Sequence, residues 1–369
     1  TITKNLEWMN IRDLRQKEAA HSYLFESDQR SIINACPRFG KIRVAINIIK
    51  ELNSRKVLLL IPRNDIWTGW DNEFNNVGVR PPIIQVSTFA SIGKLKKIEN
   101  DDWDLVIIDE PHELSINQQN KLAPLIENNK VLGLTGTMTQ KTRGELYDNL
   151  NLDVCYRYTI NQGVAEGILT DYNMYVHHVK LDGKKFIYKS AKGRQFTEKG
   201  YFELYMYVRE NAKMKHFIDM KLINIIQNSH AKLVKTKELL GKFSGERVLV
   251  FCGVTNISDK LGIPVYHSKK KEEEIFTSFC NGIKYNHLAT IKMMQAGITV
   301  LPINKGIINY MSGNPEDSAQ KICRFLGFEY SNPDKKAEIH IITSDEQFEL
   351  SRLKTGLLFF DPAKITYYK

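Results

Sequence analysis

The stretch Asp104-Leu-Val-Ile-Ile-Asp-Glu-Pro-His112 constrains the fold more than any other part of the sequence. Its apolar run predicts a strand buried on both faces, as in a parallel sheet covered by helices. Asp109 and Glu110 end the run abruptly, and an unpaired carboxylate is costly to bury. We therefore expect both acids at the carboxyl edge of the sheet, where such sheets bind ligands. Taken alone, the stretch favours a strand end with two solvated acids, and its neighbours reverse that preference.

Strand-like and helix-like segments alternate around this stretch. Apolar strands are predicted at 31–35, 56–62, 83–88, 104–109 and 130–135. Helical spacing of apolar residues predicts helices at 14–26 and 44–50. Strands that alternate with helices are typical of a mostly parallel sheet flanked by helices, so the expected fold class is α/β.

The sequence changes character after residue 153, and a second set of strands follows. These strands are predicted at 172–181, 247–252, 265–268, 288–290 and 338–343. A chain of 369 residues is long enough for two cores of ordinary size. We predict two domains, 1–165 and 166–369, and the second domain carries a basic, mainly helical insertion at about 182–244.

The charge balance and the cysteines limit the function classes. A net charge of +10 suits a polyanionic partner, without separating nucleic acid from acidic protein or a membrane surface. No apolar run approaches the roughly 20 residues of a membrane span, and no secretory signal opens the sequence. We expect a cytoplasmic protein, in the host cytoplasm if it is viral, with no membrane partner. The five scattered cysteines lack metal-ligand spacing and are expected to be buried thiols.

The segment Ala35-Cys-Pro-Arg-Phe-Gly-Lys41 lies between a predicted strand and a predicted helix. That is the setting of a phosphate-binding loop. Gly40 would let backbone amides approach a phosphate, the helix that follows would offer its positive end, and Lys41 would add a cation. A lone Gly-Lys pair is more often an exposed turn, but the acidic strand downstream favours phosphate binding here.

Four segments fall in the order and approximate spacing of a known motif series: Ala35 to Lys41, Asp109-Glu-Pro-His112, Leu134-Thr-Gly-Thr137 and Ser318-Ala-Gln-Lys-Ile-Cys-Arg324. Over its whole length the chain resembles superfamily 2 helicases. It looks like a compact phage-type DNA helicase, similar to UvsW-like branch-migration helicases and restriction-enzyme motor subunits. Segment 162–172 resembles the junction between the domains of that group. The resemblance implies two tandem RecA-like domains with a nucleotide cleft between them, and ATP and Mg²⁺ as cofactors.

The resemblance also assigns roles to polar residues. Asp109 would hold Mg²⁺ through water, and Glu110 would orient the water that attacks the γ-phosphate. His112, Thr135 and Thr137 would couple the nucleotide to the other domain. The implied catalytic set is Lys41, Asp109, Glu110, Gln320 and Arg324, and the implied ATP-binding set is Gln16, Arg38, Phe39, Gly40, Lys41, Ile42 and Gly297.

The chemistry of three of these residues suits the implied roles. Gln320 and Arg324 are one helical turn apart and would share a face. The planar guanidinium of Arg324 suits phosphate oxygens, although without the preceding motifs a surface arginine would be the default interpretation. The amide of Gln16 offers the donor and acceptor that an adenine edge requires, whereas most helical glutamines are simply solvated.

Nucleic-acid contacts are expected at strand ends, where amides, arginine and hydroxyls bind phosphates without reading sequence. The expected residues are Pro62, Arg63, Asn64, Thr88, Gly253 and Thr255. Trp67, Trp70 and Phe89 lie nearby in sequence, and aromatic residues at such spacing more often belong to the core than stack on bases. The basic stretch 184–199 is either an extra duplex or fork contact or a solvated loop.

Two positions depart from the motif pattern. Ile42 stands where a Ser or Thr hydroxyl normally ligates Mg²⁺, and Gly327 stands where a second arginine is expected. Segment 292–300 resembles the fifth motif, with Gly297 in place and Thr299 where an acid is frequent. These departures favour slow turnover, a substitute ligand or loss of the motor activity.

The expected function is an ATP-dependent DNA helicase or translocase that acts on forked or branched DNA in replication, recombination or repair. Single-stranded DNA is also an expected partner, RNA remains open, and the chain is expected to act as a monomer. One alternative is a non-catalytic nucleic-acid-binding protein on a decayed helicase scaffold. A second alternative is the motor subunit of a restriction system.

Overall fold

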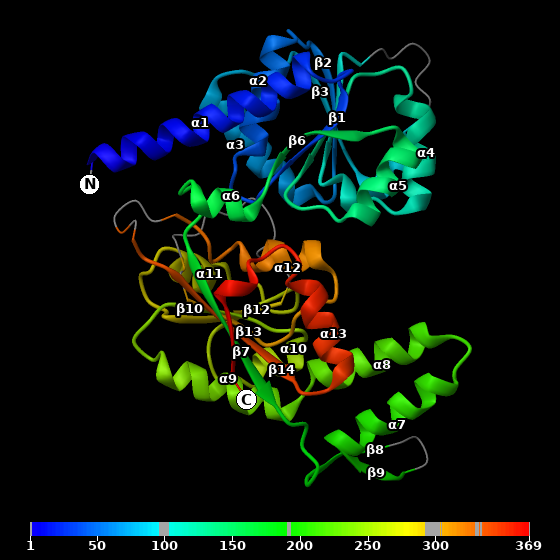
Figure 1. Ribbon diagram of the computed structural model, residues 1–369, viewed down its shortest axis with the longest axis vertical. Helices are drawn as coiled ribbons and strands as arrows, with labels where there is room; N and C mark the ends of the chain where they lie inside the picture. Colours follow the sequence, from blue (N-terminus) through cyan, green and yellow to red (C-terminus); the bar gives the residue numbers. More distant parts are fainter. Residues whose placement is uncertain are drawn as a thin grey trace. The chain divides into compact units, whose positions relative to one another are not determined.

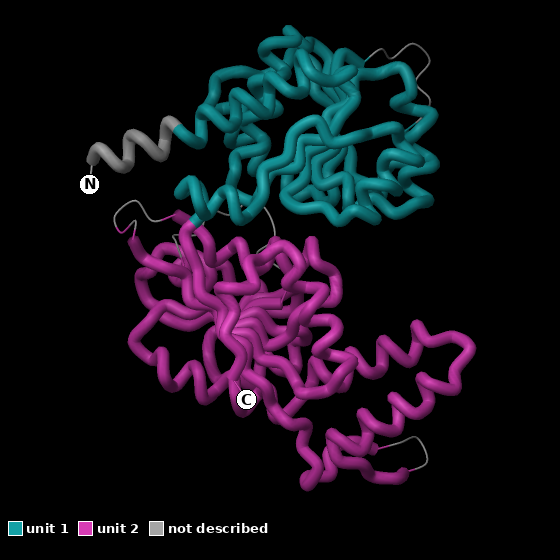
Figure 2. Tube along the Cα trace, viewed as in Figure 1, with its two compact units in different colours: residues 1–169, 296–298 teal, residues 170–295, 299–369 magenta. Residues whose placement is uncertain are grey.

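The computed structural model describes residues 2–95, 103–189, 193–291, 303, 305–328, 332 and 334–368. These residues form two compact units, unit 1 with the described residues up to 169 and unit 2 with the described residues from 170 onward (Figure 2). Each unit contains its own parallel sheet with flanking helices. The predicted fold class, two tandem RecA-like domains of α/β type, is therefore confirmed.

The units divide between Leu169 and Thr170, a few residues after the predicted boundary. The backbone N–H of Leu169 donates to the carbonyl of Gly163 at 2.8 Å, which keeps the segment with unit 1. Thr170 instead donates from its backbone N–H to Leu326 O at 3.1 Å and from its hydroxyl to Gly327 O at 2.8 Å. These hydrogen bonds explain why the division falls here.

Unit 1 is a six-stranded sheet with the order β3-β2-β4-β5-β1-β6, in which all neighbouring strands are parallel. Its strands are β1 (Arg30–Ala35), β2 (Lys56–Ile61), β3 (Ile83–Thr88), β4 (Leu105–Asp109), β5 (Val131–Thr135) and β6 (Asp153–Tyr158). Its helices are α1 (Ile2–Phe25), α2 (Lys41–Glu51), α3 (Trp67–Val77), α4 (Ile116–Ile126), α5 (Gln140–Leu150) and α6 (Ile160–Ala165), with short 3-10 turns η1 (Asn64–Ile66), η2 (Phe89–Lys94) and η3 (Pro111–Glu113). In Figure 1, α1 to α3 lie on one side of this sheet and α4 and α5 on the other.

The central strands form because their side chains are apolar without interruption. Every residue of β4 is buried, as are the residues of β2 after its first. Helices α4 and α6 begin with capping boxes, in which Ser115 and Thr159 bond reciprocally with the glutamine three residues later. The core between the sheet and α4 and α5 includes Leu60, Ile108 and Leu122.

Strand β6 was not predicted from the sequence. It lies at the edge of the sheet beside β1, and most of its side chains are only half-buried. An edge strand of this kind carries mixed residues such as Asp153, Cys155 and Arg157, so it lacks the continuous apolar run that marked the central strands.

Unit 2 is a seven-stranded parallel sheet with the order β11-β12-β10-β13-β14-β7-β15. Its strands are β7 (Tyr172–Val179), β10 (Val248–Phe251), β11 (Val265–Tyr266), β12 (His287–Thr290), β13 (Lys305–Ile308), β14 (Ala337–Ser344) and β15 (Ile365–Tyr368). The helices that accompany them are α9 (His230–Lys242), α10 (Thr255–Asp259), α11 (Glu273–Cys280), α12 (Pro315–Ile322) and α13 (Gln347–Gly356), with the 3-10 turn η4 (Pro362–Lys364). Strands β13 and β15 were not predicted.

The remaining elements of unit 2 project from it as a separate lobe (Figure 1). They are the hairpin of β8 (Phe186–Lys189) and β9 (Gln195–Thr197), and the helices α7 (Glu198–Asn211) and α8 (Lys215–Gln227). Helix α9 differs, because Leu233, Leu239 and Leu240 join the main core and the helix contacts β14 and β7. The inserted lobe is therefore shorter than the predicted 182–244 and ends with α8.

The structure bears on the predictions about the cysteines and about membrane-spanning helices. All five cysteines are free, and all are buried or half-buried, which confirms the expectation of reduced thiols. Among the described helices, none combines the length and the apolar character that crossing a membrane requires.

Candidate active site

The carboxyl edge of the unit 1 sheet collects most of the predicted site residues. Asp109 ends β4, Thr135 ends β5, and the loop 36–40 follows β1. These three strands are adjacent in the sheet. Parallel neighbours end at the same edge, so the predicted phosphate loop, acids and hydroxyls come together as the ligand site of a sheet of this type.

The predicted phosphate loop has the geometry that its sequence implies. Gly40 precedes α2 in the left-handed region at φ 93°, and Arg38 is also left-handed at φ 66°. A Cβ atom on Gly40 would lie 2.3 Å from Nε2 of Gln16, so glycine is required by both backbone and space. Lys41 begins α2, and its Nζ donates a long 3.4 Å hydrogen bond to Ala35 O. This cation is thus held at the mouth of the loop by a weak contact.

Gln16 lies against the loop rather than in solvent. It is buried on α1, and its Nε2 donates to the carbonyl oxygen of Phe39 at 2.7 Å. The ring of Phe39 is fully buried and packs against Tyr158 of β6, with ring centroids 5.1 Å apart. Gln16 therefore fixes the loop directly. Its predicted contact with adenine stays a prediction.

Asp109 is buried and carries a specific partner. The indole Nε1–H of Trp70, on α3, donates to Asp109 Oδ2 at 2.9 Å. Burial, with the neighbouring charge of Glu110, raises the pKa of Asp109 to about 7, while Trp70 and Lys41 oppose that rise. A bound cation would stabilise the charged form of this buried carboxyl group. The sequence favoured a core position for Trp70 but did not indicate its contact with Asp109, because that contact depends on β2 and β4 being neighbours in the sheet.

Glu110, His112 and the two threonines form one connected network. Glu110 is left-handed at φ 56°, and its Oε2 accepts the N–H of Gly136 at 3.3 Å. His112 Nδ1 lies 3.3 Å from the same oxygen and 2.8 Å from Thr135 Oγ1. Thr135 donates its hydroxyl proton to Thr137 O at 3.1 Å. Its oxygen must therefore accept from His112, which places the imidazole proton on Nδ1.

The contacts of Glu110 are compatible with the motif assignment. Its Oε2 accepts the N–H of Gly136 and lies 3.3 Å from His112 Nδ1, so Oε1 would be the oxygen available to orient a water molecule. A change at the Glu110 carboxylate reaches Thr135 and Thr137 through a single imidazole. The predicted residues His112, Thr135 and Thr137 are thus brought together. Their coupling role stays a prediction.

The residues present suit a magnesium nucleotide. No group of three or more His, Cys, Asp or Glu side chains comes together as a metal site in the part of the chain that the structure describes. One buried carboxylate, Asp109, suits an ion that keeps most of its waters and binds phosphate oxygens. Lys41 and the start of α2 suit the phosphates. Ile42 is half-buried and brings no oxygen, as the sequence indicated.

The predicted nucleic-acid residues of unit 1 lie farther along the same edge. Thr88 ends β3, Pro62 follows β2, and these strands pair so that Ile61 is opposite Thr88. Asn64 is exposed at the start of η1, and Arg63 contacts Asp65 at 3.3 Å. Trp70 and Phe89 are buried, so they belong to the core, as their spacing suggested.

In unit 2 the structure places four of the predicted residues. Gln320 is half-buried on α12, while Arg324 lies in the turn just after the helix ends, with its N–H bonded to Lys321 O at 3.2 Å. Gly253 and Thr255 follow the carboxyl end of β10. A Cβ on Gly253 would lie 2.7 Å from Gln227 Cγ, so this turn packs closely on α8. Gly297 lies outside the described residues.

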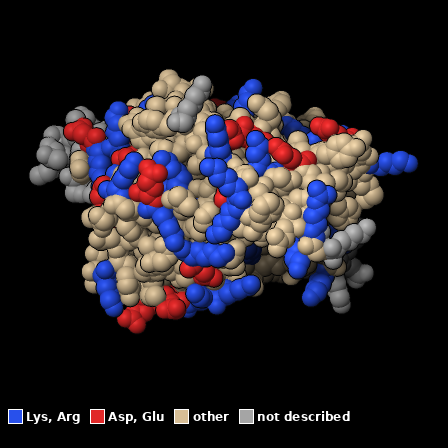
Figure 3. Space-filling view, turned by 90° about the horizontal axis from the view of Figure 1, so that it is seen from below, with Lys and Arg blue, Asp and Glu red and all other residues tan. Residues whose placement is uncertain are grey.

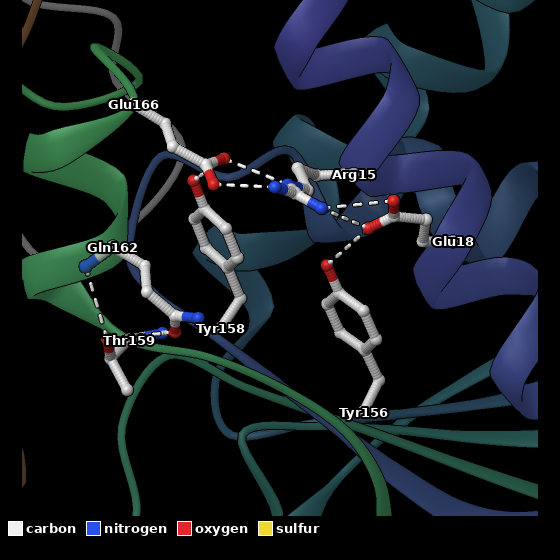
Figure 4. A network of polar contacts seen from close by, with 7 residues as sticks. All are labelled: Arg15, Glu18, Tyr156, Tyr158, Thr159, Gln162 and Glu166. Carbon is white, nitrogen blue, oxygen red and sulfur yellow. Dashed lines mark hydrogen bonds and ion pairs between the residues drawn. The ribbon is translucent and has the colours of Figure 1, made fainter.

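A second network, which the sequence did not reveal, joins α1 to β6 and to the end of α6 (Figure 4). Arg15 binds Glu166 with two hydrogen bonds, from Nη2 at 2.6 Å and from Nε at 2.9 Å. Its Nη1 also bonds Glu18 at 2.8 Å, and Tyr158 donates to Glu166 at 2.8 Å. The Arg15 hydrogen bonds hold the pKa of Glu166 below its usual range. The only sequence signal was that Glu166 lies in the junction segment, and Arg15 beside Gln16.

Comparison with known proteins finds similar chains among restriction enzymes and helicases. Residues 8–140 match the family model described as type III restriction enzyme, res subunit. The DNA 3'-5' translocase XPB2 of Sulfurisphaera tokodaii is 26% identical over 379 residues, which cover 93% of this chain and 84% of that protein. A probable helicase of African swine fever virus is 22% identical over 396 residues, which cover 94% of this chain and 43% of the viral protein. The chain thus spans less than half of that relative.

Solved structures share the fold. The type ISP restriction-modification enzyme LlaBIII bound to DNA superposes with a TM-score of 0.62 at 14% identity, over 96% of this chain and 31% of that enzyme. At this identity the likeness concerns the fold alone. The two relatives are a DNA translocase and a probable helicase, and the chain is similar to ATP-hydrolysing helicases of this kind.

Proposed function

We propose that the chain is a magnesium-dependent ATPase that translocates on DNA, with forked or branched DNA as its substrate in replication, recombination or repair. The connected carboxylate, imidazole and hydroxyls of Glu110, His112 and Thr135 carry this proposal. A protein that only clamps nucleic acid has no chemical need for a water-orienting acid tied to a reporting histidine. The phage-type, UvsW-like affiliation and action as a monomer belong to this proposal too.

Each site residue has a place in the proposed cycle. The loop ending at Gly40 and the Lys41 ammonium bind the phosphates, and a magnesium ion held by Asp109 would neutralise part of their charge. Glu110 orients the water that attacks the γ-phosphorus, while the bond to the bridging oxygen breaks and ADP leaves. Arg324 of unit 2 stabilises the transferred phosphoryl group when the two domains close on ATP. Opening after hydrolysis moves the chain along the nucleic acid.

DNA is the proposed polymer for three reasons. XPB2 is named a DNA translocase, and the LlaBIII structure is bound to DNA. The net charge of +10 favours a polyanion. Figure 3 shows Lys and Arg side chains spread over the face seen from below, among fewer Asp and Glu side chains. RNA is the competing polymer, because none of the proposed contacts reads a 2′-hydroxyl.

The decisive experiment measures ATP hydrolysis by the purified chain with no polymer, forked DNA, linear duplex, single-stranded DNA and RNA. We expect DNA to stimulate turnover, most strongly when forked. Lys41→Ala and Glu110→Gln should each lower turnover about 100-fold or more, because the first removes a cation from the phosphates and the second removes the carboxylate that orients the attacking water. Lys50→Ala, at the exposed end of the same helix, and Glu113→Gln, three residues after Glu110, are the matched controls.

The alternatives predict different outcomes. Turnover at background with salt-sensitive DNA binding would support the decayed scaffold, for which Ile42 and the buried Gly327 are the structural arguments. Recovery of nuclease or methyltransferase subunits with the chain would support a restriction motor. Unwinding of forked DNA by the isolated chain would instead support a self-sufficient helicase.

A further inference from the structure

The contact between Trp70 and Asp109 joins the core of unit 1 to the proposed magnesium site. The Trp70 side chain is fully buried on α3, with its ring 6.0 Å from that of Phe74. Its Nε1–H donates to Asp109 Oδ2 at 2.9 Å. Because the indole N–H can only donate, the Asp109 oxygen is the acceptor of this bond. The packing of Trp70 therefore fixes how the carboxylate faces the loop.

The absence of a hydroxyl after Lys41 makes this donor consequential. In phosphate-binding loops of this type the residue after the lysine supplies an oxygen to magnesium. Ile42 brings neither a ligand nor a hydrogen-bond donor. Asp109 is the last residue of β4. Glu110 follows the strand in a left-handed conformation, and its carboxylate accepts the N–H of Gly136. The placing of magnesium then depends more heavily on the orientation of one carboxylate.

We propose that Trp70 is a positioning residue that holds Asp109 for magnesium and takes over the orienting role that a hydroxyl at position 42 would share. Because Oδ2 accepts the indole N–H, Oδ1 would be the oxygen available to the ion or to its water. Donors that orient a metal-binding carboxylate typically change metal affinity by about 10- to 100-fold when they are removed. This inference rests on the proposed function, since it concerns the magnesium of the nucleotide site.

The test measures the magnesium dependence of ADP binding by the full chain, with a fluorescent ADP as the probe. Trp70→Phe removes the N–H and keeps an apolar ring. We expect it to raise the half-saturating magnesium concentration about 10-fold, while ADP binding in EDTA is unchanged. Trp67→Phe is the matched control, because Trp67 lies on the same helix with its ring against Phe74 and the Arg80 guanidinium.

A restored hydroxyl separates positioning from packing. Ile42→Thr added to Trp70→Phe should bring the magnesium dependence back to within about threefold of wild type, and Ile42→Thr alone should change it less. A folded Trp70→Phe protein with wild-type magnesium dependence would overturn the inference. A double variant as impaired as Trp70→Phe would overturn the claim that the indole takes over from the hydroxyl.

The indole itself provides a readout that survives if Trp70→Phe does not fold. The chain has four tryptophans, so the Trp70 N–H resonance can be assigned by changing Trp8, Trp67 and Trp103 to Phe one at a time. That resonance should move when magnesium is added to the ADP complex, and its immobility would overturn the inference. If wild-type protein binds no ADP or ignores magnesium, the proposed function fails. If wild type responds and the Trp70 variant matches it, only this inference fails.

Discussion

Two lysines, Lys41 of unit 1 and Lys232 of unit 2, differ in burial and in how fully the protein satisfies their hydrogen bonds. Lys41 begins α2 half-buried, and its Nζ has one long hydrogen bond, to Ala35 O at 3.4 Å. Lys232 of α9 is fully buried in an ion pair with Glu349 of α13. The other oxygen of Glu349 accepts the N–H of Ser344 at 2.8 Å. The Lys232 ammonium is fully buried in its ion pair and contributes to stability. The Lys41 ammonium has hydrogen-bonding capacity that a ligand can use.

We expect the largest effect on stability when the buried ion pair of Lys232 and Glu349 is broken. Lys232→Met should lower the free energy of unfolding by about 3–5 kcal/mol, because it leaves the Glu349 carboxylate buried without its cation. Lys41→Met should change it by less than about 0.5 kcal/mol, since it loses a single weak contact. Guanidinium denaturation measures both. Lys232→Met with Glu349→Leu should recover most of the loss; a double variant as unstable as the single one would show that packing, and not the unpaired charge, is responsible.

The buried Asp109 carboxyl of the candidate site should make the free energy of unfolding depend on pH. The pKa of Asp109 is raised by burial to about 7, so between its ordinary value of 3.8 and 7 the folded protein holds a proton that the unfolded chain has released. Stability from this group is therefore full at low pH and is lost as pH rises through 7. In EDTA, Asp109→Asn should raise the free energy of unfolding by about 1–3 kcal/mol at pH 8 and change it little at pH 4.

Trp70→Phe tests the assignment of that pH dependence. Denaturation curves at pH 5 and pH 8 give the slope directly for each protein. Because the indole bond favours the charged carboxylate, its removal should steepen the fall in stability between these pH values, while Asp109→Asn should flatten it. A pH dependence that is the same in wild type and Asp109→Asn would assign it to another group.

Much of the fold could be predicted because its determinants are local. The short apolar runs of β2, β4 and β5 favour buried strands, and Gly40 marks the loop before a helix. Strand β6 and helix α9 were missed or misplaced because their partners are supplied by the sheet and not by their own pattern. Edge strands and covering helices have weaker signals.

The candidate site also has parts that the sequence predicts and parts that it does not. Its motif residues are contiguous short segments, so their convergence follows from strands that end at one edge. The contacts that support them join residues distant in sequence: Trp70 with Asp109 across 39 residues, Arg15 with Glu166 across 151, and Lys232 with Glu349 across 117. One sequence gives no physical reason to pair these particular side chains. Which lysine is saturated is likewise decided only by the assembled fold.

The third prediction concerns the pair that ties α1 to the end of α6. Arg15→Ala should lower the free energy of unfolding by about 1 kcal/mol, because it removes a two-point contact with Glu166 that is one-third exposed or less. Arg15→Lys should lose most of this, since an ammonium cannot reproduce the fork. The pKa of Glu166 is lowered, so the contribution is present at neutral pH and is lost as pH falls below the usual carboxyl range.

The matched control is the Arg43 to Glu73 pair, which joins α2 to α3 at 2.7 Å with the arginine more exposed. Arg43→Ala should cost less than about 0.5 kcal/mol. Equal losses in urea denaturation for Arg15→Ala and Arg43→Ala would mean that the α1 network in Figure 4 contributes no more than an ordinary surface pair.

The last prediction compares two nearby threonines of the site, of which Thr137 should have a very small effect on stability. Thr135 Oγ1 contacts both His112 and the Thr137 carbonyl, whereas the Thr137 hydroxyl is buried with no hydrogen-bond partner. Thr135→Val should cost about 1–2 kcal/mol, and Thr137→Val less than about 0.5, because only the first leaves buried groups unpaired. If an unsatisfied group is kept for function, Thr137→Val should still lower the DNA stimulation of ATP hydrolysis several-fold. Unchanged stimulation, measured beside unchanged denaturation, would show that this hydroxyl has no coupling role.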